Sequence, residues 1–342
     1  MTFNTIKTIR YMGSKSKLLE FIIPNILENT SSNDVVVDLM AGSYAISYAL
    51  KPYRKLICND VQKYSECIGK AIIENQNKVI SSKLAFEDIY DDYILNKNFL
   101  VKDYFTRIYS NTYFSEEQCS DIDSIMFAIS NKTNVYLKSL YTLALMNAMC
   151  KVQSTPGHFA QYMPSTNIRI KKLQEMSLYN EFINACEYYS DLYFNDNNNI
   201  ILCADYRYIL ENNLLSDAKL IYLDSPYTQE QYSRFYHLLE TVVRDDEPEL
   251  KFKAKYRNDR FKSGFCYKNK VAREFEFIFL YCKIHKKRLV ISYSNKGVLG
   301  IADMESLAKK YFKNVEIITQ EFMHSTQGKG KLPVNEILMI CK

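Results

Sequence analysis

Four short apolar segments that each end in an acidic residue most constrain how this chain folds. The acids that close them are Asp38, Asp60, Asp205 and Asp224. Short runs of Val, Ile and Leu bounded by turn signals are typical of buried parallel strands, whose carboxyl ends meet at the sheet edge where α/β proteins bind ligands. A helix cap or an Asx turn explains one such acid equally well. Four in succession are much less expected from capping alone, so we predict a single ligand-lined edge.

Strand and helix signals alternate in two blocks along the chain. In the first block, strand-like runs at 35–39 and 55–59 flank a helical stretch at 43–50. Near residue 199 the alternation resumes, with strand-like runs at 200–203, 220–224, 289–294, 315–322 and 334–341. Helical patterns lie between most of them, at 206–212, 232–243, 271–285 and 303–312, but none separates the last two. We therefore predict an α/β fold, a doubly wound and mostly parallel sheet of seven strands that ends in an antiparallel hairpin.

Between these blocks, from residue 62 to 198, helical signals dominate. The run Ser115-Glu116-Glu117-Gln118 matches a capping box at a helix start, and 135–149 is apolar on most faces, as a buried helix is. The polar run 196–199 is typical of a linker that returns to the sheet. We expect a mainly helical domain at 62–198, inserted into an α/β domain made of 1–61 and 199–342.

The composition is that of a well-buried globular protein, because 47% of the residues are hydrophobic. The nine cysteines include no CxxC pair and fall mostly in apolar stretches, which is typical of reduced core residues. The most apolar uncharged stretch, 140–150, is too short to span a bilayer, and no apolar leader precedes a cleavage site at the amino terminus. We expect a soluble, cytoplasmic protein without a membrane segment.

The net charge of +5 is unevenly distributed. Between Lys251 and Arg288 there are 13 Lys and Arg against 3 Asp and Glu, so the rest of the chain is net acidic. A solvated helix face or loop explains such a segment about as well as a surface that binds phosphates. Aromatic residues interleave these charges, among them Phe252, Tyr256 and Phe261, and that arrangement favours nucleic acid as the partner.

The run Asp38-Leu39-Met40-Ala41-Gly42-Ser43 follows the first strand, at the turn where doubly wound folds bind a nucleotide-like cofactor against a helix amino terminus. The dinucleotide fingerprint GxGxxG is absent, and the Gly-Lys-rich run 328–331 lacks the spacing and strand context of a phosphate-binding loop. These absences disfavour NAD and ATP. Asp60 follows the second strand, where an acid reaches ribose hydroxyls in nucleotide-binding folds, and Asp205 has the same two interpretations, ligand contact or cap.

Near the amino terminus, Arg10-Tyr11-Met12-Gly13-Ser14-Lys15 precedes a helical pattern at 18–27. A lysine beside a glycine turn can pair with a carboxylate of a bound ligand while the tyrosine packs on that ligand. An ordinary helix entry is the simpler alternative for this segment.

The tetrapeptide Asp224-Ser225-Pro226-Tyr227 follows the apolar run 220–223 and has the chemistry of a loop that binds an amine. A carboxylate accepts a hydrogen bond from an exocyclic amine, a proline fixes the backbone, and a tyrosine stacks on a flat ring. A strand followed by a Ser-Pro turn explains an isolated match more simply, so the tetrapeptide gains its meaning from the other motifs.

Taken together, these motifs resemble the Dam-like class of DNA N6-adenine methyltransferases in both order and spacing, over nearly the whole chain. In that class a Tyr/Trp-x-Gly-Gly/Ser-Lys motif comes first, an acidic and glycine-containing motif follows the first strand, and Asp-Pro-Pro-Tyr comes later. Similar enzymes also carry stretches like those at 113–115, 157–159, 231–237 and 292–295. A lone histidine in an aromatic setting is more often a packed residue than a base, so we interpret His158 and His237 in that way.

The resemblance implies the S-adenosylmethionine methyltransferase fold, S-adenosylmethionine as cofactor, and site-specific methylation of an adenine that is flipped out of double-stranded DNA. It implies no metal ion. The catalytic residues implied are Asp224, Ser225, Pro226 and Tyr227, with Asp224 and the Ser225 carbonyl holding the amine. The cofactor-binding residues implied are Tyr11, Gly13, Lys15, Asp38, Gly42, Asp60, Asp205 and Asp224. The domain at 62–198 would recognise the target, and the α/β domain would be the catalytic one.

Two residues depart from the family pattern. Ser225 replaces a proline in the catalytic loop, which predicts a less rigid loop, and Tyr44 replaces a second glycine, which predicts a narrower cofactor turn unless its side chain points away. An N4-cytosine or RNA adenine methyltransferase would keep the same cofactor edge, and a catalytically silent DNA-binding protein would keep the fold. The sequence leaves open a restriction endonuclease counterpart, the recognition sequence and the oligomeric state.

Overall fold

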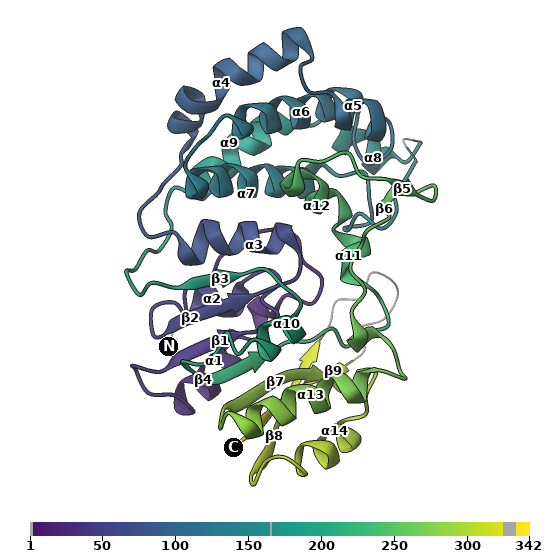
Figure 1. Cartoon of the computed structure of the whole chain (residues 1–342). Helices are drawn as coiled ribbons and strands as arrows, with labels where there is room; N and C mark the ends of the chain where they lie inside the picture. Colours follow the sequence, from purple (N-terminus) through teal and green to yellow (C-terminus); the bar gives the residue numbers. More distant parts are fainter. Residues whose placement is uncertain (1–2, 165, 324–332) are drawn as a thin grey trace.

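The computed structural model describes residues 3–164, 166–323 and 333–342 and contains a seven-stranded sheet with the order β3-β2-β1-β4-β7-β9-β8 (Figure 1). The first five strands in this order are parallel, and β9 runs antiparallel to both of its neighbours. The strands of this sheet are β1 (Val35–Asp38), β2 (Lys55–Asn59), β3 (Ile200–Leu202), β4 (Ala218–Leu223), β7 (Arg288–Ser294), β8 (Val315–Met323) and β9 (Pro333–Cys341). The predicted seven-stranded fold with its final hairpin is confirmed.

Helices cover both faces of the sheet because successive strand side chains point to opposite sides. Val36 and Tyr222 face a core shared with α1 (Leu19–Glu28), α2 (Ala45–Leu50) and α3 (Lys63–Gly69). Their neighbours Val37 and Ile221 face a second core, shared with α10 (Tyr206–Glu211), α13 (Val271–Ile284) and α14 (Ile301–Ala308). Burial on both faces explains why these strands are continuous apolar runs.

The chain between β2 and β3 is helical. After α3 and a short π-helix, η2 (Lys70–Glu74), it forms α4 (Ser82–Phe99), α5 (Tyr104–Tyr109), α6 (Glu116–Ser130), α7 (Val135–Val152), α8 (Ile168–Gln174) and α9 (Leu178–Tyr188). The capping box predicted at the start of α6 is present, with Ser115 and Gln118 each bonded to the other's backbone N–H. Helices α4 to α9 form a layer above the sheet in Figure 1.

The polar return segment is attached to the end of α2 through Lys51. The buried Lys51 ammonium donates to the carbonyls of Ile72 and Tyr193, at 2.8 and 3.1 Å, and the Asn195 amide donates to the Lys51 carbonyl at 2.6 Å. The asparagines in the return segment therefore satisfy backbone groups at the junction between the helical layer and the sheet.

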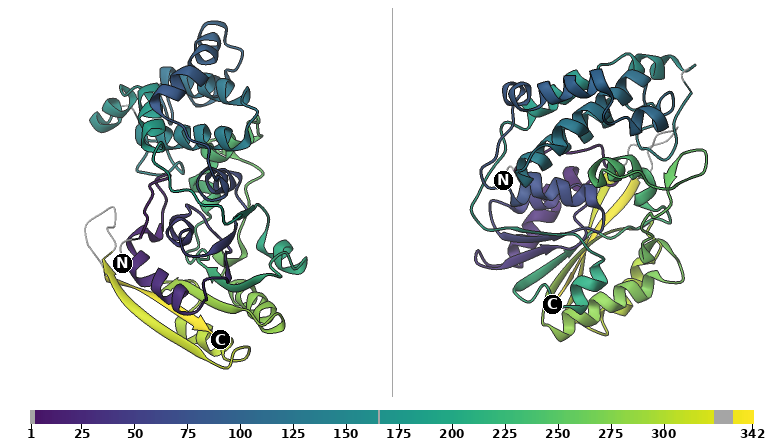
Figure 2. Two further views of the ribbon diagram at one scale, coloured as in Figure 1. Left: turned by 90° about the vertical axis from the view of Figure 1, so that its left-hand side faces the viewer. Right: turned by 45° about the horizontal axis from the view of Figure 1, so that its top comes forward.

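Two details differ from the predicted elements. The helix predicted at 232–243 is two helices, α11 (Tyr232–Phe235) and α12 (His237–Arg244), which meet where Tyr236 leaves helical geometry. A small hairpin of β5 (Leu250–Lys251) and β6 (Tyr256–Arg257) lies at the start of the basic segment. The sequence did not predict this hairpin, because its strands are short. Figure 2 shows the hairpin of β8 and β9 along one edge of the sheet. The Gly-Lys-rich run 328–331 lies outside the described residues.

Over the described ranges, we find no helix that combines the length and apolar character needed to cross a membrane.

Candidate active site

A cavity of about 300 Å³ opens at the carboxyl ends of β1, β2 and β4. In the sheet register, Asp38 is level with Cys58 on one side and Tyr222 on the other, so Asp60 and Asp224 lie two residues further along their chains at the same edge. The cavity is lined by every residue for which the sequence predicted a role: Tyr11, Gly13, Lys15, Asp38, Gly42, Asp60, Asp205, Asp224, Ser225, Pro226 and Tyr227.

Backbone N–H groups and small turns organise the loops after β1 and β2. The Asp60 carboxylate accepts hydrogen bonds from the N–H groups of Gly42 and Gln62, both at 2.9 Å, and thereby joins the two loops. Gly42 has φ +53°, and an added Cβ would come within 2.9 Å of the Tyr11 hydroxyl. This position therefore requires glycine both for its backbone conformation and for its space.

Asp38 closes β1 with one carboxylate oxygen held and the other open. The Ser47 hydroxyl, from the first turn of α2, donates to Asp38 Oδ2, whereas the buried Oδ1 has no hydrogen-bond partner among the described residues. Burial raises the pKa of Asp38 to about 7, and the Ser47 hydrogen bond opposes this rise. A buried acceptor aimed at a cavity is suited to a ligand that donates a hydrogen bond or carries positive charge.

The Tyr44 side chain points away from the cavity. Tyr44 has φ +62°, a left-handed conformation that favours glycine, and its ring is fully buried against α3. A Cβ added at Gly69 of α3 would lie 2.5 Å from the Tyr44 ring, so Gly69 provides the space for the ring. The predicted narrowing of the turn after β1 is therefore absent, because Ser43 and Ala45 line the cavity while Tyr44 does not.

Asp205 both lines the cavity and caps a helix. Its carboxylate accepts from the Arg207 N–H at 2.8 Å, as the N-cap of α10. Asn59, at the end of β2, holds this strand end in place by donating to the carbonyls of Leu39 and Ala204. The interpretation of Asp205 as a cap is confirmed, and the residue also lines the cavity, where its contact with a ligand stays a prediction.

Lys15 connects the amino-terminal motif to the loop after β4. Its ammonium lies 3.1 Å from Asp224 Oδ1, 3.8 Å from Glu336 Oε2 and 4.9 Å from the centre of the Tyr227 ring, and the side chain is 4% exposed. Burial lowers the pKa of Lys15, but the carboxylates of Asp224 and Glu336 outweigh burial and raise it above its ordinary value. The sequence predicted that Lys15 pairs with a carboxylate of a bound ligand, whereas here it pairs with carboxylates of the protein.

The loop Asp224-Ser225-Pro226-Tyr227 presents a carboxylate and an aromatic ring to the cavity. Burial raises the pKa of Asp224 to about 6, although the Lys15 charge opposes it, so the carboxylate is ionised at neutral pH. The Tyr227 carbonyl accepts from the Val298 N–H at 3.0 Å, and its ring meets the Tyr293 ring edge-on at 6.2 Å. Tyr227 is therefore fixed at both its backbone and its ring.

Ser225 is 1% exposed, and its hydroxyl has no hydrogen-bond partner among the residues described here. A buried hydroxyl without a partner costs about 1–3 kcal/mol relative to a satisfied one. Nothing in the structure assigns this hydroxyl a structural function, and the side chain fills the place of the family's proline without a compensating contact.

Two tyrosines that the sequence did not single out individually support one wall of the cavity: Tyr232 lines it, and Tyr236 packs on the lining residue Tyr11. Tyr11 stacks on Tyr236 with ring centres 4.9 Å apart and lies 5.6 Å from Tyr232, and the Met12 N–H donates to the Tyr236 hydroxyl. The resemblance of 231–237 to similar enzymes was the only sequence signal for these residues. Glu336 gave no signal at all, because it reaches Lys15 through the antiparallel pairing of β9 with β7.

The two histidines considered as bases lie outside this cavity's lining. The buried His237 ring forms a hydrogen bond through Nε2 with the Phe159 carbonyl at 3.0 Å, and burial lowers its pKa to about 3. His158 packs on Phe235 with ring centres 4.6 Å apart. Both are packed residues, as predicted.

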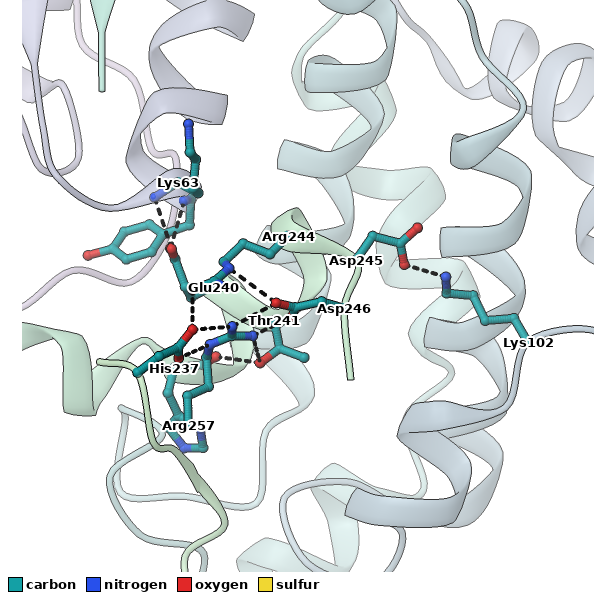
Figure 3. A network of polar contacts seen from close by, with 11 residues as sticks. Lys63, Lys102, His237, Glu240, Thr241, Arg244, Asp245, Asp246 and Arg257 are labelled. Carbon is teal, nitrogen blue, oxygen red and sulfur yellow. Dashed lines mark hydrogen bonds and ion pairs between the residues drawn. The ribbon is translucent and has the colours of Figure 1, made fainter. Parts of the chain in front are cut away.

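The basic segment is partly neutralised by one acid that precedes it in the chain, Asp246, and by one acid within it, Asp259. Arg257 is 1% exposed and forms ion pairs with Asp246, at 2.8 Å, and with Asp259, at 3.1 Å (Figure 3). The same acidic stretch contacts the helical layer, since Asp245 pairs with Lys102. The net charge counted over residues 251–288 is therefore larger than the free positive charge of this segment, although Lys253 and Lys262 remain exposed.

Figure 3 also shows Glu240 of α12 at the start of α3. Its carboxylate accepts from the N–H groups of Lys63 and Tyr64, at 3.2 and 3.1 Å. Helix α12 packs against both α3 and α7. The polar network thus connects the helix that follows Asp60 with the basic segment and the helical layer.

Comparisons with known proteins agree with this geometry. A family model described as D12 class N6 adenine-specific DNA methyltransferase matches residues 11–307. Modification methylase LlaI of Lactococcus lactis subsp. lactis is 28% identical over 98% of this chain and 55% of its own length. Type II methyltransferase M.FokI of Planomicrobium okeanokoites is 28% identical over 89% of this chain and 47% of its own length. Type II methyltransferase M.NlaIII of Neisseria lactamica is 24% identical over 89% of each chain. This chain spans about half the length of the first two relatives.

Proposed function

Because this chain belongs to the D12 class N6 adenine-specific DNA methyltransferase family, we propose that it methylates the exocyclic N6 amine of a specific adenine in double-stranded DNA, with S-adenosylmethionine as the methyl donor. The observation that carries the proposal is the single cavity in which three strand-end acids, Asp38, Asp60 and Asp205, meet the loop Asp224-Ser225-Pro226-Tyr227. The names of the relatives favour a modification methylase with a restriction endonuclease counterpart as its biological setting.

The loops after β1 and β2 fit the cofactor. S-adenosylmethionine supplies an electrophilic methyl group on a cationic sulfonium, and the cavity offers it Asp38, Asp60 and Asp205 against the paired cation Lys15. Asp60 is fixed by the Gly42 and Gln62 N–H groups, at the place where an acid reaches ribose hydroxyls in related folds. The unpartnered Asp38 Oδ1 is a buried acceptor for a donor of the ligand.

The loop after β4 fits the amine of the substrate. Lys15 binds Asp224 Oδ1, and Asp224 Oδ2 forms no hydrogen bond or ion pair within the described ranges, so Oδ2 is free to accept an amine N–H. With the Ser225 carbonyl as a second acceptor, the amine lone pair would be turned toward the methyl group. Bound S-adenosylmethionine would supply the methyl group, so that an N–C bond would form as the S–C bond of the sulfonium breaks, and the proton that the amine loses would pass through the Asp224 carboxylate to solvent. Alignment and charge stabilisation supply most of the acceleration.

An adenine inside a duplex has to leave the helix to reach this cavity. Unstacking costs a few kcal/mol, and stacking on an aromatic ring returns about 1–3 kcal/mol. Tyr227, whose ring packs on Tyr293 and whose carbonyl accepts from the Val298 N–H, would provide this stacking. In this proposal residues 1–61 and 199–342 form the catalytic domain, and the helical region at 62–198 recognises the target sequence.

The test is incubation of the protein with duplex DNA and methyl-labelled S-adenosylmethionine, followed by mass spectrometry of the nucleosides. We expect N6-methyladenine from the wild type, none from Asp224→Ala, and wild-type yield from Asp217→Ala, which removes an exposed carboxylate at the opposite end of β4. N4-methylcytosine as the product would replace the proposed target base. If the wild type gives no methylated product and calorimetry detects no binding of the cofactor, the chain retains the fold without the enzymatic activity.

The cofactor site has a separate test. Asp60→Ala removes the acceptor that joins the two loops, so we expect the calorimetric Kd for S-adenosylmethionine to rise by one to two orders of magnitude, roughly the loss of a hydrogen bond to a charged group. An unchanged Kd in this variant would remove Asp60 from the cofactor site.

A further inference from the structure

Three arginines that the proposed chemistry does not use are carried by segments that line the cavity. Each is adjacent in sequence to a residue that lines the cavity: Arg10 precedes Tyr11, Arg234 follows Ser233, and Arg260 precedes Phe261. They come from the amino-terminal motif, from α11 and from the loop after β6. Three segments far apart in the chain, all of which line the cavity, thus each carry an arginine next to a lining residue.

Arg10 lies flat against the backbone of Gly157. A Cβ added at Gly157 would come within 2.8 Å of the Arg10 guanidinium carbon, and Gly157 has φ +129°. The backbone conformation therefore disfavours a side chain at Gly157, and the absence of one leaves room for the guanidinium of Arg10, a residue that is exposed to solvent. The Arg10 guanidinium forms no ion pair within the parts of the chain that the structure describes.

The side chains of Arg234 and His158 both pack on the ring of Phe235. The Arg234 guanidinium lies 5.3 Å from the ring centre, and the His158 ring centre lies 4.6 Å from it. Arg234 forms an ion pair with Glu230 at 2.9 Å, but this carboxylate is 54% exposed and such surface pairs contribute little. The Arg234 Nε is buried and has no hydrogen-bond partner among the described residues, so a donor remains unsatisfied.

The charges of this group repel one another. Arg260 lies over the Tyr256 ring at 4.6 Å, and its pKa is lowered by burial and by the neighbouring charge of Arg234. The pKa of His158 is lowered by burial and by the charges of Arg234 and Arg10. The His158 Nδ1 accepts from the Ala160 N–H at 3.3 Å, so the neutral ring carries its proton on Nε2 and is a further donor. Glu230 is the one acid that pairs directly with these arginines in the described structure.

We propose that Arg10, Arg234 and Arg260, together with the His158 Nε2–H, bind a backbone phosphate of the DNA strand next to the flipped nucleotide. Like charges held together without matching acids are stabilised by an anion, and guanidinium groups match phosphate oxygens in a bidentate geometry. A nucleotide that enters the cavity brings its phosphodiester to the cavity mouth, and the segments that carry this group line the same cavity. This inference rests on the proposed function. It assigns to these four side chains the contact that holds the DNA strand in place while the nucleotide is flipped out.

The test compares DNA binding by Arg10→Gln and Arg234→Gln with the wild type, using cofactor-loaded protein and a duplex that the wild type methylates. Losing one phosphate contact should weaken binding on the order of tenfold, and it should reduce the slope of log K against log salt by about one. The matched control is Lys55→Gln, an exposed lysine at the amino end of β2, which should keep the wild-type slope. Arg10→Lys and Arg234→Lys keep the charge and should keep most of the slope, with unchanged affinity for S-adenosylmethionine.

A second measurement needs no variant. Duplexes in which single phosphates around the target adenine are replaced by neutral methylphosphonates should bind the wild-type protein with the same loss of slope at one or two positions. The loss should not add to that of Arg234→Gln, because both remove the same contact. If the wild type methylates DNA but neither the glutamine variants nor any methylphosphonate changes the slope, the phosphate site is refuted and the methylation stands. If the wild type neither binds nor methylates DNA, both proposals fall.

Discussion

The two sides of the cavity are built in different ways. On the side formed by the loops after β1 and β2, backbone N–H groups and glycine conformations hold the acids, as the Asp60 carboxylate does between Gly42 and Gln62. On the side formed by the loop after β4, buried side-chain charges hold the acids, because Lys15 lies between Asp224 and Glu336. The first side depends on local geometry, whereas the second depends on an ion-pair arrangement that pH and single charges alter.

The largest effect should come from the β4 side. Asp224→Asn keeps the shape of the side chain but loses the charge that accepts the amine, so kcat should fall roughly 10²–10³-fold, as when one preorganised partner of a transition state is lost. Binding of S-adenosylmethionine should change far less. Single-turnover experiments measure the rate, and calorimetry measures the affinity for S-adenosylmethionine. A rate near the wild-type value would contradict a catalytic role for the β4 side.

The β1–β2 side should respond mainly in stability. An alanine inside a helix normally stabilises relative to glycine by about 0.5–1 kcal/mol, but at Gly69 its Cβ would meet the Tyr44 ring at 2.5 Å. We therefore expect Gly69→Ala to lower the free energy of unfolding by about 1–3 kcal/mol in urea titrations. The control is Gly300→Ala, where the nearest atom is 3.2 Å away at the end of the Asp303 side chain. An increase in stability at Gly69 would mean that Tyr44 does not depend on this space.

The pH dependence should distinguish the two sides. Because the pKa of Asp224 is raised to about 6, activity that needs its ionised form should decline as the pH falls through that value. Glu336→Gln removes a negative charge that raises this pKa, so the acid limb of the kcat profile should move to lower pH. Lys15→Gln removes the opposing positive charge and should move it to higher pH. If both variants shift the limb in the same direction, the ion-pair description of the β4 side is wrong.

The smallest effect concerns Ser225. Pro226 already biases the preceding residue to extended conformations that proline also adopts, and the Ser225 N–H forms no hydrogen bond in the part of the chain described here. Ser225→Pro should therefore raise the free energy of unfolding by about 0.4–1 kcal/mol and leave kcat nearly unchanged. Thermal unfolding and steady-state rates measure these outcomes. A loss of stability would show that the native loop is incompatible with the family's proline.

The fold and the lining of the cavity were predictable from the sequence because both depend on local patterns. Buried parallel strands are continuous apolar runs, and each of the four acids either ends its strand or follows it within three residues, so the edge where Asp38 and Asp224 meet could be inferred without a structure. The capping box at Ser115 was visible for the same reason. Contacts between distant segments were not predictable.

Glu336 and the division of helix 232–243 illustrate this limit. Glu336 reaches Lys15 only because β9 pairs with β7 in one register, and a single acid inside a strand pattern carries no signal of that. Tyr236 ends α11 because its ring stacks on Tyr11 and its hydroxyl accepts from Met12, partners more than two hundred residues away in the chain. The neutralisation of Arg257 likewise involves Asp246, an acid outside the basic window.

The most direct test of the central claim is methylation-sensitive sequencing of DNA from cells that express the protein, with cells that express Asp224→Ala as the control. The account predicts N6-methyladenine at one position of one recurring sequence, present with the wild type and absent with the variant. Equal methylation in both, or none with the wild type, would contradict it.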